Sequence, residues 1–115
     1  MSELVGIARF QFHEGQVEEY KRLSREAMEI VRAREPGTLE YSIYLNADET
    51  AAVVIERFRD ADAALEHSRN MAEIGAKVMA TGTIVGELLG DVTPEIRANV
   101  ESGDQPKLYA PWMSK

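Results

Sequence analysis

Short apolar runs, bounded by turn residues, predict four β-strands in the first 90 residues of the chain. In the first run Phe10 and Phe12 fall on one face and Arg9 and Gln11 on the other, which is typical of a strand with one buried side. The third run contains consecutive Val-Val-Ile, which favours burial on both faces. The predicted strands cover residues 4–12, 39–45, 52–58 and 83–89.

Two other segments have apolar positions three and four residues apart and predict amphipathic helices. The first is stopped by Pro36-Gly37, because proline cannot continue a helix. The second follows Asp60 or Asp62, either of which can cap it, and it turns His67 inward. We expect Gly75 to break or bend this helix. The two apolar stripes are Val17, Tyr20, Leu23, Ala27, Ile30 and Val31, and then Ala64, His67, Met71, Ile74 and Val78.

The end of the chain adds a short helix and a terminal strand. Thr93 followed by Pro94 is a helix start, a hydroxyl cap with proline at the first helical position. Residues 107–112 form a short apolar tail. We therefore expect residues 1–115 to form a single domain, with a C-terminal extension from about residue 91.

The resulting order of elements is βαββαβ, which is typical of a ferredoxin-like α+β fold with an antiparallel sheet and two main helices on one face. The strands look apolar on both faces, yet the helices cover only one. A bare apolar sheet would expose more surface than a monomer normally tolerates. We infer a homodimer in which two sheets pack face to face.

Composition narrows the classes of function. Thirteen Lys and Arg against twenty Asp and Glu give a net charge of −7, so nucleic acid is a poor candidate partner. The chain has no cysteine, which excludes disulfides and thiolate chemistry. No apolar run has the length of a membrane span and no signal peptide is evident, so we expect a cytoplasmic protein without a membrane partner.

His67 is the main candidate for chemistry, because a histidine can accept or donate a proton near neutral pH. Glu56, on the strand before it, could orient the imidazole. The structural alternatives are a core histidine bonded to a backbone carbonyl or to Glu56, and an ion pair of Glu56 with Arg9 or Arg57. An isolated buried carboxylate would be costly, so a partner for Glu56 is expected.

Several further side chains are candidates for binding a flat ligand, although aromatic residues also fill ordinary cores. We expect neither a dedicated metal site nor a nucleotide cofactor, because histidines are few and no phosphate-binding glycine loop is present. A single histidine suffices as an axial ligand of haem, so the sequence does not exclude a haem cofactor. The candidate substrate-binding residues are Arg9, Phe10, Phe12, Tyr41, Phe58 and Met71.

Two spaced motifs precede His67 in the chain, namely Pro36-Gly37-x-Leu39-x-Tyr41 and Val54-x-Glu56-x-Phe58-x-Asp60-x-x-Ala63. Together with His67, these motifs resemble those of the antibiotic biosynthesis monooxygenase (ABM) domains. The resemblance implies a dimeric α+β barrel with a cavity between helices and sheet, and it assigns His67 and Glu56 to the site. The chain departs from many members at Ala72, where they have a second histidine, and at Phe58, where they have tryptophan.

The resemblance implies a cofactor-independent monooxygenase that oxidises a quinol or polyphenolic aromatic with O₂. In that hypothesis His67 accepts a phenolic proton and Glu56 holds its tautomer. Two alternatives stay open. One is an isomerase of a small carbonyl compound, of the autoinducer-2 degradation type; the other is a small-molecule-binding dimer without turnover.

Overall fold

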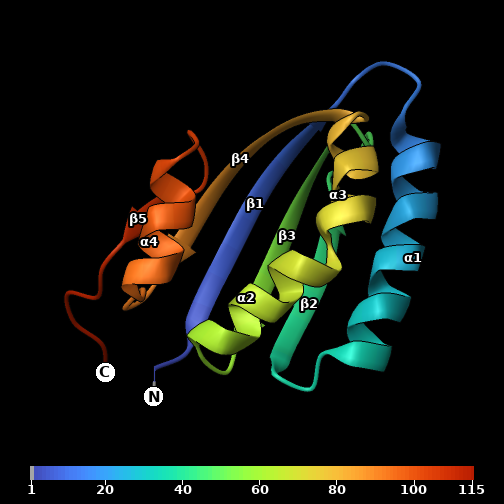
Figure 1. Ribbon diagram of the computed structural model, residues 1–115. Helices are drawn as coiled ribbons and strands as arrows, with labels where there is room; N and C mark the ends of the chain where they lie inside the picture. Colours follow the sequence, from blue (N-terminus) through green and yellow to red (C-terminus); the bar gives the residue numbers. More distant parts are fainter. Residues whose placement is uncertain (1) are drawn as a thin grey trace.

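A five-stranded sheet in the order β2-β3-β1-β4-β5, with helices on one face, makes up the protein (Figure 1). The computed structural model describes residues 2–115. Neighbouring strands are antiparallel except β4 and β5, which are parallel. This confirms the predicted ferredoxin-like α+β class. The elements are β1 (Leu4–Phe12), α1 (Val17–Arg34), β2 (Thr38–Leu45), β3 (Ala51–Phe58), α2 (Ala61–Asn70), α3 (Ala72–Met79), β4 (Gly82–Leu89), α4 (Pro94–Glu101) and β5 (Lys107–Tyr109).

Side chains at the helix starts act as caps, as the sequence predicts. The Asp60 carboxylate accepts a hydrogen bond from the Ala63 backbone N–H at 2.9 Å, which resolves the choice between Asp60 and Asp62. The Thr93 hydroxyl likewise accepts from the backbone N–H of Ile96 at 3.2 Å. Both helices therefore begin where a local signal places them.

The predicted break at Gly75 was wrong in position. The helix is interrupted at Met71, and Gly75 lies inside α3, where its N–H donates to the Met71 carbonyl at 2.6 Å. A glycine costs a helix only about 1 kcal/mol, so packing of the flanking turns can hold it in helical conformation.

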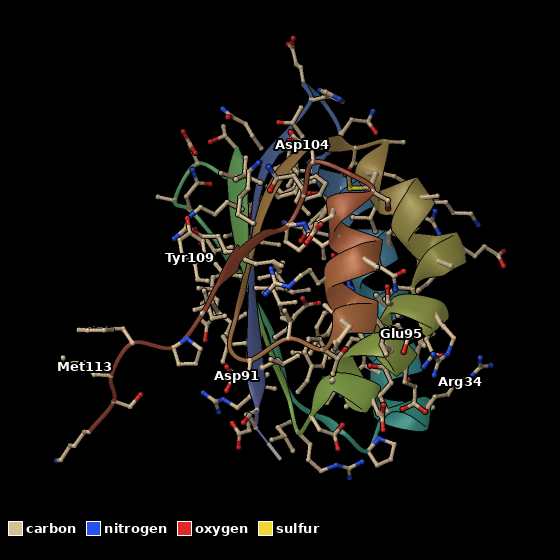
Figure 2. All side chains as sticks on the ribbon, turned by 60° about the vertical axis from the view of Figure 1, so that its left-hand side comes forward. Arg34, Asp91, Glu95, Asp104, Tyr109 and Met113 are labelled. Atoms are coloured by element: carbon tan, nitrogen blue, oxygen red, sulfur yellow. The ribbon has the colours of Figure 1, made fainter. Side chains whose placement is uncertain are left out.

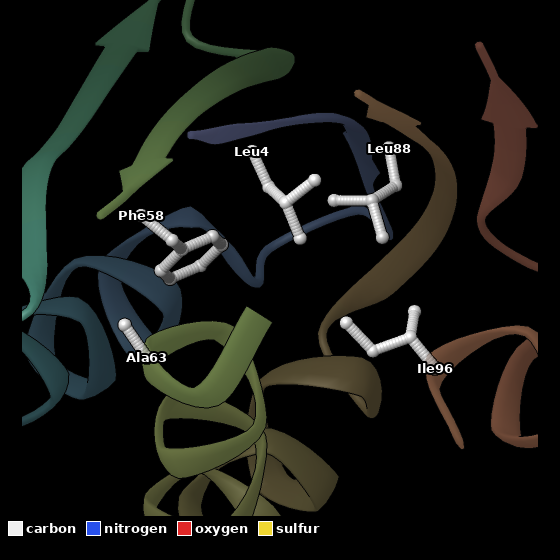
Figure 3. Close-up of a cluster of buried hydrophobic side chains, with 5 residues drawn as sticks. All are labelled: Leu4, Phe58, Ala63, Leu88 and Ile96. Carbon is white, nitrogen blue, oxygen red and sulfur yellow. The ribbon is translucent and has the colours of Figure 1, made fainter. Parts of the chain in front are cut away.

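The helix-facing side of the sheet carries the core. Leu4, Phe58, Ala63, Leu88 and Ile96 form one buried cluster, to which β1, β3, α2, β4 and α4 each contribute (Figure 3). Ile96 is only 4% exposed, so helix α4 is part of the core. The segment after β4 is thus packed against the same face of the sheet as α2.

No helix within the described residues covers the opposite face of the sheet (Figure 1). On it Val85 and Tyr44 are 55% and 56% exposed, although Val54 on the helix side of β3 is buried. The neighbours Val53 and Ile55 are only partly buried in the single chain. None of the helices among residues 2–115 is long and apolar enough to cross a bilayer.

Candidate active site

His67 lies between two carboxylates that come from distant parts of the chain. Its Nδ1 is 2.8 Å from Glu35 Oε1, and its Nε2 is 2.8 Å from Glu56 Oε2. Helix α2 supplies the histidine, the residue after α1 supplies Glu35, and β3 supplies Glu56. The imidazole is thus held at both nitrogens, and only 8% of the residue is exposed.

Glu35, which the sequence analysis did not select, is the most enclosed of the three groups. It is 4% exposed and accepts hydrogen bonds from Thr38 Oγ1 at 2.8 Å and Asn70 Nδ2 at 3.1 Å, besides its contact with His67. The one sequence signal was a glutamate placed directly before Pro36-Gly37, where the chain must turn back toward the sheet. A buried carboxylate needs such partners to remain charged.

The two carboxylates favour the protonated imidazole. Burial alone would lower the pKa of His67, but the hydrogen bonds and charges of Glu56 and Glu35 outweigh it and raise that pKa above its ordinary value. For Glu35 the directions are reversed. Burial alone would raise the pKa of this carboxyl, but hydrogen bonds from Asn70, Thr38 and His67 outweigh burial and lower it. With both nitrogens donating, the imidazolium has no free lone pair.

Two of the candidate aromatic residues frame this histidine. The rings of Tyr41 and Phe58 lie with centroids 5.5 Å and 5.3 Å from the imidazole. Burial, together with the nearby charge of Glu56, raises the pKa of the Tyr41 phenol. Met71 packs against the apolar cluster between α1 and α3, as Tyr41 also does. Tyr41 and Phe58 are therefore the two candidates that lie against the imidazole of His67.

In the described part of the chain, none of the remaining three candidates contacts the imidazole of His67, although Phe10 lines a cavity together with Glu56. Phe10 and Phe12 stack around Tyr20, with ring centroids between 4.7 and 5.8 Å apart. Arg9 lies on the sheet face away from the helices, where its guanidinium contacts Glu87 at 2.6 Å. Arg9 is therefore not brought together with His67 within this chain.

Glu56 pairs with His67 and with neither of the arginines considered from the sequence. Arg9 binds Glu87, and Arg57 lies 3.5 Å from Glu40. The carboxylate of Glu56 is also the one group of the His67 cluster that lies on the walls of two cavities. His67 and Glu35 line neither of them, so Glu56 is the group placed to meet a ligand.

The two cavities share Ala8, Glu56 and Ile84 on the helix side of the sheet. The smaller, of about 110 Å³, lies beneath α1 and includes Phe10, Tyr20 and Tyr41. The larger, of about 310 Å³, lies over β1 and β4 and reaches Gln105 and Pro106 of the C-terminal segment. A groove of about 560 Å³ between α1 and β2 contains none of the His67 cluster.

Within residues 2–115 no three His, Asp or Glu side chains are grouped so as to hold a metal ion. What the cluster does offer is a proton acceptor, Glu56, beside a proton donor, His67. Such a pair can remove a proton from a bound molecule in a mostly apolar cavity.

Solved structures share this fold. MupZ from Pseudomonas fluorescens has a TM-score of 0.84 and 21% identity, covering 100% of this chain and 94% of its own. Rv0793 from Mycobacterium tuberculosis has a TM-score of 0.70 and 25% identity, covering 80% and 97%. SnoaB from Streptomyces nogalater, a cofactor-independent oxygenase, has a TM-score of 0.67 and 21% identity, covering 76% and 91%. A search of curated proteins found no match.

The similarity to MupZ includes the C-terminal segment, since it covers the whole chain, whereas the other two similarities leave part of the chain out. The family described as antibiotic biosynthesis monooxygenase matches residues 4–76. That range contains all three members of the His67 cluster, Glu35, Glu56 and His67. The chain belongs to the antibiotic biosynthesis monooxygenase family.

Proposed function

We propose that this protein is a cofactor-independent monooxygenase that oxidises a quinol or polyphenolic aromatic with O₂. The observation that carries the proposal is the Glu56 carboxylate, which lies on the wall of two apolar cavities and is backed by His67 at 2.8 Å. Membership of the ABM family and the likeness in fold to an oxygenase support the reaction class.

In the proposed reaction Glu56 accepts the phenolic proton. His67 holds the carboxylate in place through Nε2 and is itself held by Glu35 through Nδ1. This reverses the roles expected from the sequence, where His67 was the base and Glu56 its orienting partner. The reason is geometric, since His67 has both nitrogens engaged and Glu56 faces the cavities.

The resulting anion is electron-rich and passes one electron to O₂. The two radicals combine to form a peroxide anion at a ring carbon that bears hydrogen, and this anion takes back the proton held by Glu56 to give a hydroperoxide. Loss of water from the hydroperoxide leaves a carbonyl at that carbon. One oxygen atom enters the product and the other leaves as water, so no external reductant is needed. The protein contributes orientation, a proton acceptor and exclusion of water by side chains such as Phe10 and Ile84.

We further expect the protein to act as a homodimer through the sheet faces opposite the helices. The support is the exposure of Val85 and Tyr44 on an otherwise packed sheet. A dimer of this kind would leave the His67 cluster on the outer, helix-covered side of each subunit.

The test is dissolved-oxygen uptake with a panel of hydroquinones and naphthoquinols, after subtraction of autoxidation. Wild type should show saturable uptake, with ¹⁸O from ¹⁸O₂ in the product. Glu56→Gln should lose about 10²-fold or more of the rate, since it cannot accept the proton. His67→Ala should also lose most of it. The control Glu73→Gln changes an exposed carboxylate on α3 and should behave as wild type. Absence of uptake above autoxidation would overturn the proposal.

A second candidate function rests on the same acid–base pair. A carboxylate beside a protonated imidazole can move a proton next to a carbonyl group, which would make the protein an isomerase of a small carbonyl compound. Turnover of such a compound under nitrogen, at an unchanged rate, would favour this function. A requirement for O₂ would favour the monooxygenase.

A further inference from the structure

The C-terminal segment forms one wall of the larger cavity. Gln105 Oε1 accepts a hydrogen bond from the backbone N–H of Gly86 in β4 at 2.8 Å. Pro106 lies directly on Gly86, where an added Cβ would come 3.2 Å from the proline Cβ. The side chain of Gln105 is therefore fixed against the strand, and the absence of a side chain at position 86 lets Pro106 approach.

The segments before and after Gln105 and Pro106 hold this wall in place. Before it, Ile96 of α4 lies in the buried cluster of Figure 3. After it, β5 pairs with β4, and the Gly90 N–H donates to the Tyr109 carbonyl at 3.0 Å. Figure 2 shows the chain from Asp104 to Tyr109 running from the end of α4 past the sheet. The wall is therefore held in place by packed or paired residues on both sides of it, although Gln105 and Pro106 are themselves only partly buried.

The orientation of the Gln105 amide follows from its partner. The Gly86 N–H needs an acceptor, so the amide oxygen faces β4 and the NH₂ group is the remaining donor. Gln105 lines the cavity, and the hydrogen bond of its side chain within residues 2–115 is the one accepted by Oε1. The amide NH₂ of Gln105 on the C-terminal wall and the carboxylate of Glu56 on the sheet are therefore a donor and an acceptor among the lining residues.

Between these two polar groups the lining is mainly apolar, with Ala8, Ile84 and Leu88 on the strands and Met79 at the end of α3. A volume of about 310 Å³ is at the lower end of the range of ligand pockets. It suits a ligand of one or two fused rings. Such a ligand can satisfy both groups only if it carries a hydroxyl group and a separate hydrogen-bond acceptor.

We propose that Gln105 is a specificity-determining residue, whose amide N–H binds a carbonyl oxygen of an aromatic ligand while Glu56 accepts the ligand's hydroxyl proton. The ligand class is a hydroxyaryl carbonyl compound of up to two fused rings. The part assigned to Glu56 rests on the proposed function, whereas the part assigned to Gln105 concerns binding and holds without turnover.

Two probes that differ by one acetyl group, compared in wild type and in variants of Gln105, test the proposal. 2-Naphthol carries the hydroxyl alone, and 6-acetyl-2-naphthol adds a carbonyl at the far end of the ring system. By isothermal titration calorimetry at neutral pH, wild type should bind the acetyl compound about 3- to 10-fold more tightly, the effect of one buried neutral hydrogen bond. Gln105→Glu keeps the oxygen that Gly86 needs but loses the N–H donor, so it should abolish the preference.

Controls separate binding from folding and charge. Gln16→Glu makes the same chemical change at the start of α1, outside both cavities, and should keep the wild-type preference. Gln105→Met removes the donor without adding charge and should abolish the preference as well. Far-ultraviolet circular dichroism and thermal unfolding then check that each variant is folded.

Equal affinity of wild type for the two probes, no binding of either, or a preference retained in the folded Gln105 variants would each overturn the proposal. Oxygen uptake is measured on the same samples with naphthoquinols. If wild type takes up oxygen but does not prefer 6-acetyl-2-naphthol over 2-naphthol, only the role of Gln105 is overturned. If it shows that preference but takes up no oxygen, only the monooxygenase function is overturned.

Discussion

The carboxylate of Glu56 lies directly over Gly6, its partner across strands β1 and β3. A Cβ atom at position 6 would come 2.8 Å from Glu56 Oε1, too close for a non-bonded contact. The bare backbone at Gly6 therefore leaves the space in which Glu56 reaches His67. The position of the proposed base depends on a residue without a side chain.

Gly6→Ala should displace the Glu56 carboxylate from His67 while the protein stays folded. The clashing atom is the end of a flexible side chain, and alanine gains about 0.5–1 kcal/mol over glycine in a strand, so stability should change little. Oxygen-uptake kcat should fall by about 10²-fold, the usual effect of misplacing a reacting group by about 1 Å. Gly75→Ala is the control, since its Cβ meets only Met71 at 3.9 Å. An unchanged kcat in Gly6→Ala would contradict this account of the site.

Glu35→Gln should lower the pKa of His67 relative to wild type. The glutamine can still accept the Nδ1–H bond, but it removes a charge 2.8 Å from the imidazole. Loss of a close opposite charge shifts a pKa by about one to three units. Heteronuclear NMR of the ring nitrogens measures the shift, with the exposed His13 as an internal signal.

Glu35 is a positioning residue in this scheme, because it lines neither cavity. The variant should therefore lower kcat more than it raises KM. Glu73→Gln again serves as the control for loss of one surface carboxylate. A His67 pKa that does not move in Glu35→Gln would show that the buried charge has no influence on the imidazole.

The stability of the protein should depend on pH through this pair. The folded-state pKa of His67 is raised, so its contribution is complete below the unfolded value of about 6.5 and is lost as pH rises through the folded pKa. The folded-state pKa of Glu35 is lowered, so its contribution is complete above about 4.3 and is lost as pH falls through the folded pKa. The pair should stabilise most between about pH 4.3 and 6.5.

Urea unfolding of wild type and His67→Gln across pH 4–9 measures this dependence. The difference in unfolding free energy should be greatest inside that window, at about 3 kcal/mol for a broken buried pair, and should shrink toward pH 9. A difference that stays constant over the whole range would mean that the imidazole and Glu35 are not coupled through charge.

Val85→Glu should convert the expected dimer into a monomer. Val85 lies on the sheet face without helices and is 55% exposed, so a charge there would be buried at a dimer interface. Analytical ultracentrifugation measures the oligomeric state of wild type and of Val85→Glu. Asn99→Glu, on the exposed side of α4, is the control for added charge. A monomeric wild type, or a dimeric Val85→Glu, would exclude this face as the interface.

The sequence by itself determined the fold class, because its signals are local. Alternation in β1 and the Thr93-Pro94 start each act within a few residues and appear in the structure where the pattern predicted them. The cap of α2 is Asp60, one of the two aspartates that the pattern offered. The inward direction of His67 followed from the spacing of one helical stripe. The order of a strand and the helix after it made Glu56 one candidate partner of His67, but it left an ion pair of Glu56 with an arginine open as well.

Only the tertiary structure decided what His67 meets on its other side and which group faces a ligand. Glu35 is 32 residues from His67, and no periodicity links the end of α1 to the middle of α2. The alternation of side chains along β1 correctly puts Arg9 on the face opposite Phe10. Only the pairing of β1 with β4, however, reveals Glu87 as its partner. Gln105 reaches the cavity because β5 adds to the sheet edge beside β4. Such contacts depend on how distant segments pack, which local patterns along a chain do not encode.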